Sequence, residues 1–232
     1  GGGLRGGPAC STRITNNSSG RKASRSHRGG AVDLGVDPDA GIDVYVSHSW
    51  LDHPEAKKRA LARWASGVAE AEGRPPVAWV DALCCEEPLE YRAHLAHMPV
   101  RIALADRFLL LLGHTVADRL WCIMELVAFR VLGGAMEDVI IVPVGDDSGP
   151  ATTASLNRLI ASVDAFHVMY ARAARDEDTR RLVQAVELAG VSRVNDLVRA
   201  ILPAVRAACS KLEAAEAAPQ AASAPVVDAV TS

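Results

Sequence analysis

The sequence predicts one doubly wound α/β domain. Short apolar runs rich in β-branched residues alternate with longer stretches of helical periodicity. A parallel sheet covered on both faces requires such near-continuous apolar strands separated by helices. The composition agrees, since 49% of the 232 residues are apolar and 23% are charged. The expected strands are Ile42–Val46, Val77–Val80, Phe108–Leu112, Val139–Val142 and, with the weakest pattern, Ala165–Met169.

Start and stop signals bound the helices expected between these strands. Pro54 suits a first helical turn, and Gly73, followed by two prolines, ends that helix. Further helices are expected from near Pro88 with an interruption at Pro99, over 116–132, over 176–188 before Gly190, and after Asn195 as a cap, with a kink at Pro203.

The amino-acid composition predicts a disordered segment at each end of the chain. Residues 1–38 form a leader of Gly, Ser, Arg and Asn, and its first thirty residues hold six basic side chains and no acid. Residues 213–232 are mostly Ala, Pro and Ser, and neither end can bury enough apolar surface to offset its ordering entropy. The folded domain is therefore expected over 39–212, with a core over 42–170 and extra C-terminal helices over 171–212.

Charge, hydropathy and cysteine content exclude several classes of protein. The net charge of −3, with an acidic body, argues against binding the nucleic-acid backbone. The longest uncharged apolar run, 108–113, is far shorter than the roughly 20 residues of a membrane span. Five cysteines, two of them adjacent, favour reduced thiols and an intracellular, cytoplasmic protein. Because the chain opens with Gly-Gly-Gly and lacks an initiator Met, we expect a fragment.

Polar residues follow the first expected strand, where ligands of open parallel sheets bind. Ser47, His48, Ser49 and Trp50 stand directly before a helix N-terminus. Hydroxyls and free backbone amides can bind a phosphate or ribose, and an indole can stack on a base. The commoner alternative is a plain capping turn in which Ser49 or Asp52 satisfies the free amides.

The segment after the second strand, from Asp81 to Pro88, is either a mobile loop that carries acids to a pocket or a solvated connection. Cys84 and Cys85, followed by His94 and His97, also raise the possibility of a zinc site. Zinc ligands usually come as separated cysteine pairs, so packing or solvent is the preferred explanation of these residues.

The third expected helix carries the sharpest signal. Trp121, Cys122 and Glu125 share one helical face, so a carboxylate lies among apolar side chains. Desolvation would raise its pKa and suit it to a ligand hydroxyl or a nearby cation. The alternative is a structural Glu125 paired with Arg119 or Arg130. A nucleophilic Cys122 is disfavoured because buried cysteines are usually inert.

These segments together resemble the TIR (Toll/interleukin-1 receptor) domain family. Residues 43–47, Asp-Val-Tyr-Val-Ser, are similar to its opening box, and 79–81, Trp-Val-Asp, to the strand that enters its BB loop. Residues 121–126, Trp-Cys-x-x-Glu-Leu, resemble the signature of its third helix, and 142–144, Val-Pro-Val, its fourth strand. The extended forms look most like TIR-like proteins of unicellular eukaryotes, and the resemblance covers 42–170.

The resemblance implies a flavodoxin-like, five-stranded parallel sheet and hydrolysis of the nicotinamide–ribose bond of NAD+ in signalling or defence. NAD+ would be the substrate, with no metal and no further cofactor. Glu125 would be catalytic, because a carboxylate under the ribose stabilises the positive charge that develops there. The residues implied to bind NAD+ are Ser47, His48, Ser49, Trp50, Asp81, Trp121 and Cys122.

Two other functions stay open. The first is a non-catalytic interaction module that self-associates, or binds other TIR-like domains, through a BB loop made of Asp81, Leu83, Cys84, Cys85 and Glu86. That loop lacks the glycine of many NAD+-cleaving members, and His48 stands where many carry an aromatic residue or Arg. The second is a phospho-receiver, which is less favoured because the acidic pair, the acceptor Asp and the Lys of receivers are missing from the corresponding strand ends.

Overall fold

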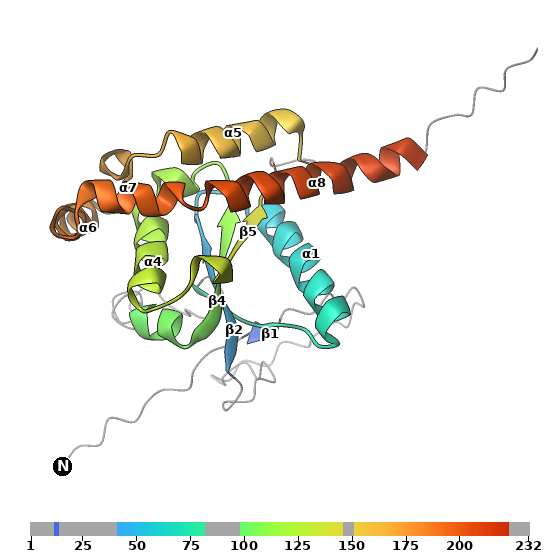
Figure 1. Cartoon of the computed structure of the whole chain (residues 1–232), viewed down its shortest axis with the longest axis horizontal. Helices are drawn as coiled ribbons and strands as arrows, with labels where there is room; N and C mark the ends of the chain where they lie inside the picture. The colour runs from blue at the N-terminus through green and yellow to red at the C-terminus, as the bar shows by residue number, and fades with distance from the viewer. Residues whose placement is uncertain (1–11, 14–40, 82–97, 146–150, 223–232) are drawn as a thin grey trace, which may run out of the picture.

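Four parallel strands form the centre of the fold. In this computed structural model, which describes residues 12–13, 41–81, 98–145 and 151–222, the strands lie side by side in the order β3, β2, β4, β5. Helices flank the sheet (Figure 1). The predicted α/β class with a helix-covered parallel sheet is therefore confirmed. The strands are β2 (Ile42–His48), β3 (Val77–Val80), β4 (Ala105–Leu112) and β5 (Val139–Pro143).

Helices connect the strands along the chain, and further helices follow β5 in succession. Gly73 closes α1 in the left-handed conformation, with φ of 72°, and donates its N–H to Ala69 O, as the sequence predicts. The helices are α1 (Pro54–Glu72), η1 (Val116–Asp118), α4 (Leu120–Val131), η2 (Met136–Asp138), α5 (Thr153–Asp164), η3 (Val168–Tyr170), α6 (Asp176–Ala189), α7 (Val191–Arg199) and α8 (Leu202–Ala222).

The strand pleat sends alternate side chains of β2 into two separate cores. Val44 and Val46 pack with Leu61 and other residues of α1 on one face. Tyr45 packs with Phe108 and the apolar face of α4 on the other, where the C-terminal helices also contribute. Because successive strand residues point to opposite faces, neighbours along β2 meet different helices. This division determines which partners each polar residue at the end of β2 can reach.

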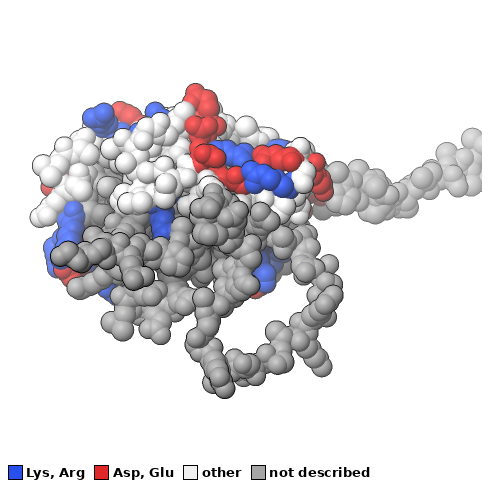
Figure 2. All heavy atoms as spheres, turned by 90° about the horizontal axis from the view of Figure 1, so that it is seen from below, with Lys and Arg blue, Asp and Glu red and all other residues white. Residues whose placement is uncertain are grey.

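Helix α8 packs against β5 and against α5 (Figure 1). Its far part comes close to α1, since Arg63 of α1 donates to Glu216 Oε1 at 2.8 Å. Seen from below, acidic and basic side chains intermingle on the surface (Figure 2). Exposed ion pairs of this kind contribute little to stability. No helix among the described residues is long and apolar enough to cross a bilayer.

The predicted strand over 165–169 is wrong. Helix α5 ends at Asp164, and Val168–Tyr170 form the 3-10 helix η3. The Val168 N–H donates to Asn195 Oδ1 at 2.8 Å rather than to a strand. Asn195 is therefore a buried anchor inside α7 and not the predicted cap, since α7 begins at Val191. Phe166 and Val168 are buried all the same, so their apolar character reflects core packing rather than strand structure.

The sheet consequently has four parallel strands among the described residues, and not the five that were predicted. A two-residue strand, β1 (Thr12–Arg13), pairs antiparallel with β3 at its outer edge. It falls within the stretch 1–38 that was predicted to be disordered. At the other end, α8 continues to Ala222, beyond the predicted domain boundary at 212. The rest of the predicted leader and tail lies outside the described residues.

The helix predicted over 116–132 is divided in two. Arg119 adopts an extended conformation between η1 and α4. The Leu120 N–H donates to Arg172 O at 3.0 Å, and the Arg172 N–H donates to Asp118 O at 2.8 Å. This pairing with the segment after η3 explains the break, because it uses backbone groups that a continuous helix would bond internally. The helix start predicted near Pro88 lies outside the described residues, and 98–103 are helical.

Candidate functional site

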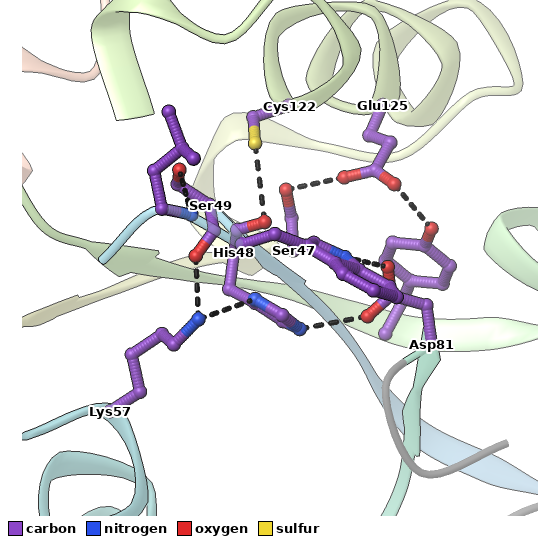
Figure 3. A network of polar contacts seen from close by, with 10 residues as sticks. Ser47, His48, Ser49, Lys57, Asp81, Cys122 and Glu125 are labelled. Carbon is purple, nitrogen blue, oxygen red and sulfur yellow. Dashed lines mark hydrogen bonds and ion pairs between the residues drawn. The ribbon is translucent and has the colours of Figure 1, made fainter. Parts of the chain in front are cut away.

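Glu125 lies on the face of α4 that packs against β2, and its side chain points at that strand (Figure 3). Tyr45 donates its hydroxyl to Glu125 Oε1 at 2.8 Å, and Ser47 donates to Oε2 at 2.5 Å. Both donors come from β2 and are two residues apart, so the pleat directs them to the same face. Glu125 is only 9% exposed. Two hydroxyl groups of β2 thus hold the carboxylate by hydrogen bonds.

The environment of Glu125 is short of positive charge. None of the described Lys, Arg or His side chains forms an ion pair with it. Burial raises the pKa of Glu125 to about 7, and the nearby Asp81 carboxylate acts in the same direction, whereas the bonds from Ser47 and Tyr45 oppose it. The structural alternative with Arg119 or Arg130 as its partner is therefore wrong. Arg130 donates to Gly134 O instead.

His48 points to the opposite face of β2 and is fully surrounded by partners. Its Nε2 lies 2.7 Å from Asp81 Oδ1, and its Nδ1 lies 3.3 Å from Lys57 Nζ. Burial by itself lowers the pKa of His48, but the hydrogen bond and charge of Asp81 outweigh burial and raise it. Lys57, on the first turns of α1, also donates to Ser49 O at 2.6 Å. Figure 3 shows this chain from Lys57 through His48 to Asp81.

Trp50 stands at the rim of the site. Its indole is 61% exposed, and its Nε1 donates to Asp81 Oδ2 at 2.7 Å. Asp81 therefore uses one oxygen for His48 and the other for Trp50. Because this bond orients the indole, the exposed aromatic face has a defined direction and is available for stacking.

A third set of contacts joins the turn after β2 to the turn after β4. Thr115 Oγ1 lies 2.8 Å from Asp52 Oδ1 and 2.6 Å from Ser49 Oγ, and the Thr115 N–H donates to the same Asp52 oxygen at 3.0 Å. A side chain at Gly113 would overlap the Asp52 carboxylate, so a larger residue there would displace that carboxylate. Ser49 Oγ also accepts from Leu51 N at 3.2 Å. Ser49 and Asp52 thus stabilise the two turns, but they do not cap α1 as the capping alternative expects, because the cap residue is His53 and no side chain bonds to the free amides there.

Cys122 and Trp121 flank the site from α4. The buried Cys122 thiol lies 3.4 Å from His48 O and bonds there. Burial raises its pKa well above the ordinary value, which disfavours the thiolate that a nucleophile needs. Trp121 is half-buried, and its Nε1 has no hydrogen-bond partner among the described residues.

The structure brings most of the predicted site residues into one region. Glu125, Ser47, His48, Cys122, Asp81 and Trp50 are linked through direct contacts or through one shared neighbour. Sequence reasoning missed Tyr45, Lys57 and Thr115. The signal for Tyr45 was present, since it stands two residues before Ser47 on the same strand face. Lys57 and Thr115 carried no such signal, because only the meeting of separate elements places them here.

Several predictions fall outside the described residues. They are the BB-loop residues Leu83, Cys84, Cys85 and Glu86 and the zinc alternative with His94 and His97. Among the residues that the structure does describe, no group of three or more His, Cys, Asp or Glu side chains is placed to hold a metal ion.

The arrangement offers a buried carboxylate near neutral pKa, hydroxyl groups beside it and an oriented indole at the rim. These groups can bind a polyhydroxylated ligand and stabilise a developing positive charge. They are grouped around the carboxyl end of β2, the position at which open α/β sheets bind ligands. In comparisons with known proteins, no protein-family model matches this chain, and no curated protein matches it significantly.

Proposed function

We propose that this protein cleaves the nicotinamide–ribose bond of NAD+ by hydrolysis. One observation carries the proposal: the Glu125 carboxylate is buried without a paired cation and is held by two hydroxyls beside the carboxyl end of the central strand. An unpaired buried carboxylate costs folding free energy. Functional sites are where such an arrangement is commonly found.

The reaction needs stabilisation of positive charge more than it needs an acid. When the C–N bond breaks, its electron pair moves to the nicotinamide nitrogen, and the ribose ring becomes an oxocarbenium-like cation. Nicotinamide leaves as a neutral molecule, so no general acid has to protonate it. Glu125 would stabilise the ribose cation electrostatically and accept a hydrogen bond from a ribose hydroxyl. Water then adds to the anomeric carbon and releases one proton, which gives ADP-ribose.

The pKa of Glu125 suits a cationic substrate. With a pKa of about 7, the free side chain is partly protonated at neutral pH. A bound nicotinamide ring carries a positive charge, and a nearby positive charge favours the ionised carboxylate. Substrate binding would therefore produce the charged form that the reaction requires.

The rim residues supply contacts for the rest of the dinucleotide. Trp50 presents an exposed indole oriented by Asp81, on which a base can stack. The start of α1 has no side-chain cap, so its free backbone N–H groups can bind a ribose or phosphate, whereas Ser49 is buried and already bonded to Thr115. The similarity of residues 43–47 and 121–126 to TIR motifs supports the same assignment and, with it, a TIR-like, flavodoxin-like domain acting in intracellular signalling or defence.

A specific observation also favours a second candidate, a non-catalytic interaction module. Both oxygens of Glu125 already have protein donors, and Trp50 and Leu51 are exposed side by side at 61% and 66%. A structural Glu125 beside an apolar contact surface would give the same picture. In this case the protein would self-associate or bind other TIR-like domains without turning over NAD+.

Release of nicotinamide from NAD+ distinguishes the two candidates. The protein is incubated with NAD+ over a range of protein concentrations, and nicotinamide is quantified for wild type, Glu125→Gln and the control Glu137→Gln. Glu137 is exposed on η2. We expect Glu125→Gln to lower turnover about 100-fold or more and Glu137→Gln to leave it unchanged.

Two outcomes would contradict the proposal. Absence of turnover at every concentration would overturn the enzymatic function, and concentration-dependent association in sedimentation would then support the interaction module. Equal turnover by Glu125→Gln and wild type would remove Glu125 from the reaction.

A further inference from the structure

Tyr45 holds the Glu125 carboxylate from inside the sheet. Its ring lies between the rings of its two register partners, Trp79 on β3 at 4.8 Å and Phe108 on β4 at 5.7 Å between centroids, both stacked. Phe108 in turn contacts Phe129 of α4 at 5.4 Å. Tyr45 is completely buried. A ring packed on both faces by neighbouring strands has no freedom to swing, so the position of its hydroxyl is determined by the sheet.

The two hydroxyls that reach Glu125 are not equivalent. Burial, and then the charge of Glu125, raise the pKa of Tyr45 well above its ordinary value, so this phenol stays protonated and donates to Oε1. Ser47 can rotate its hydroxyl hydrogen and act as donor or acceptor. When Glu125 takes up a proton, Oε1 still faces a donor. The proton therefore binds to Oε2, and the Ser47 hydroxyl oxygen can accept the hydrogen bond that this proton makes.

We propose that Tyr45 is a positioning residue that keeps Oε1 as a permanent acceptor and leaves Oε2, beside Ser47, as the oxygen that exchanges its proton and its partner. The assignment of Oε2 to a ribose hydroxyl rests on the proposed NAD+ cleavage. The unequal roles of the two oxygens do not, since they follow from the contacts of the free protein.

The other groups around Glu125 act on both oxygens together. Asp81 at the end of β3 and His48 on β2 influence it through charge, whereas burial raises the pKa of Cys122 on α4 and keeps that thiol uncharged. Within the part of the chain that the structure describes, Glu125 receives hydrogen bonds from Tyr45 and Ser47 alone. Tyr45→Phe removes one donor and keeps the stacked ring. Ser47→Ala removes the other.

Infrared spectroscopy of the free protein tests the unequal roles of the two Glu125 oxygens without any ligand. The difference spectrum between acidic and alkaline pH contains the carbonyl band of protonated Glu125, which Glu125→Gln identifies by eliminating it. We expect Tyr45→Phe to shift this band to higher frequency, because the carbonyl at Oε1 loses its hydrogen bond, and to move its titration to higher pH. Ser47→Ala should shift the band less, and Tyr170→Phe, at an exposed tyrosine, should not shift it.

A band that stays in place in Tyr45→Phe, or that moves equally in Ser47→Ala, would overturn the proposal. If Tyr45→Phe does not fold, fluorotyrosine labelling in a Tyr91→Phe/Tyr170→Phe background, which leaves Tyr45 as the single tyrosine of the sequence, replaces it. The more acidic phenol strengthens the bond, so the expected shift is to lower frequency, and no shift would again contradict the proposal.

Turnover adds a second readout. We expect Tyr45→Phe to lower kcat about tenfold with KM within about twofold, because misplaced charge affects the transition state more than substrate binding. If wild type releases no nicotinamide, the proposed function fails, yet the infrared result still decides the role of Tyr45.

Discussion

The acids on the two faces of β2 have different partners. Toward α4, Glu125 receives two hydroxyl groups, and no described cation pairs with it. Toward α1, Asp81 pairs with His48 at 2.7 Å, and Lys57 stands behind the same imidazole. The residues involved, Ser47 and His48, are adjacent in sequence. The strand pleat sends one to each environment.

The contrast shows that the partners of an acid, rather than its place beside β2, indicate whether it is available for chemistry. Asp81 has a complete set of polar partners and holds His48 and Trp50 in position. Glu125 has hydrogen bonds but lacks the compensating charge, so its pKa is displaced to about 7. The fold opposes ionisation of the Glu125 carboxylate. Glu125 is therefore a better candidate than Asp81 for a reaction in which the bound substrate brings the positive charge.

The largest effect on the free energy of unfolding is expected from replacing Glu125, the buried carboxylate without a paired cation. Because the pKa of Glu125 rises to about 7 on folding, the folded state binds more protons than the unfolded state above about pH 4.5, and stability falls as pH rises toward 7. Glu125→Gln should therefore raise the unfolding free energy at pH 8, by up to about 3 kcal/mol. Denaturant unfolding at pH 5 and pH 8 measures this.

Glu137→Gln is the matched control for that measurement and should follow wild type at both pH values. If Glu125→Gln keeps the full wild-type loss of stability between pH 5 and pH 8, the two faces do not differ in the way described.

Replacing Asp81, which pairs with His48 on the face of β2 toward α1, should change the free energy of unfolding less and in the opposite direction. Asp81 raises the pKa of His48, so the stability from this pair is fully present below about pH 6.5 and is lost as pH rises through the folded pKa. Asp81→Asn should lower the unfolding free energy by about 1–2 kcal/mol at pH 6 and by less at pH 9. NMR titration of the His48 imidazole should show its pKa falling. An equal loss of stability at both pH values would argue against the ion pair.

The smallest effect is expected at the rim. Trp50→Phe keeps an aromatic ring and removes only the bond from Nε1 to Asp81. Because the indole is largely exposed, we expect a loss of about 0.5 kcal/mol with an unchanged pH profile. A loss as large as that of Asp81→Asn would mean that Trp50, and not His48, is the main partner of Asp81.

Much of the fold could be predicted from the sequence where a local pattern determined it. The apolar runs in β2, β3 and β4 are buried on both faces, and β5 is buried on one face and half-buried on the other. The boundaries of α1 follow from Pro54 and Gly73. The run at 165–169 misled because apolar residues under a helix look like a short buried strand. Similarly, the break at Arg119 depends on Arg172, more than fifty residues away, which no local pattern indicates.

For the site, the sequence alone determined that Glu125 shares a helical face with apolar neighbours and that polar residues follow β2, since helical and strand periods fix these relations. The tertiary structure decided what those residues meet. Register placed Tyr45 between Trp79 and Phe108, and packing of α4 on β2 brought Glu125 to two hydroxyls instead of an arginine. Partners from separate elements, and the pKa that they impose, exist only once the chain has folded.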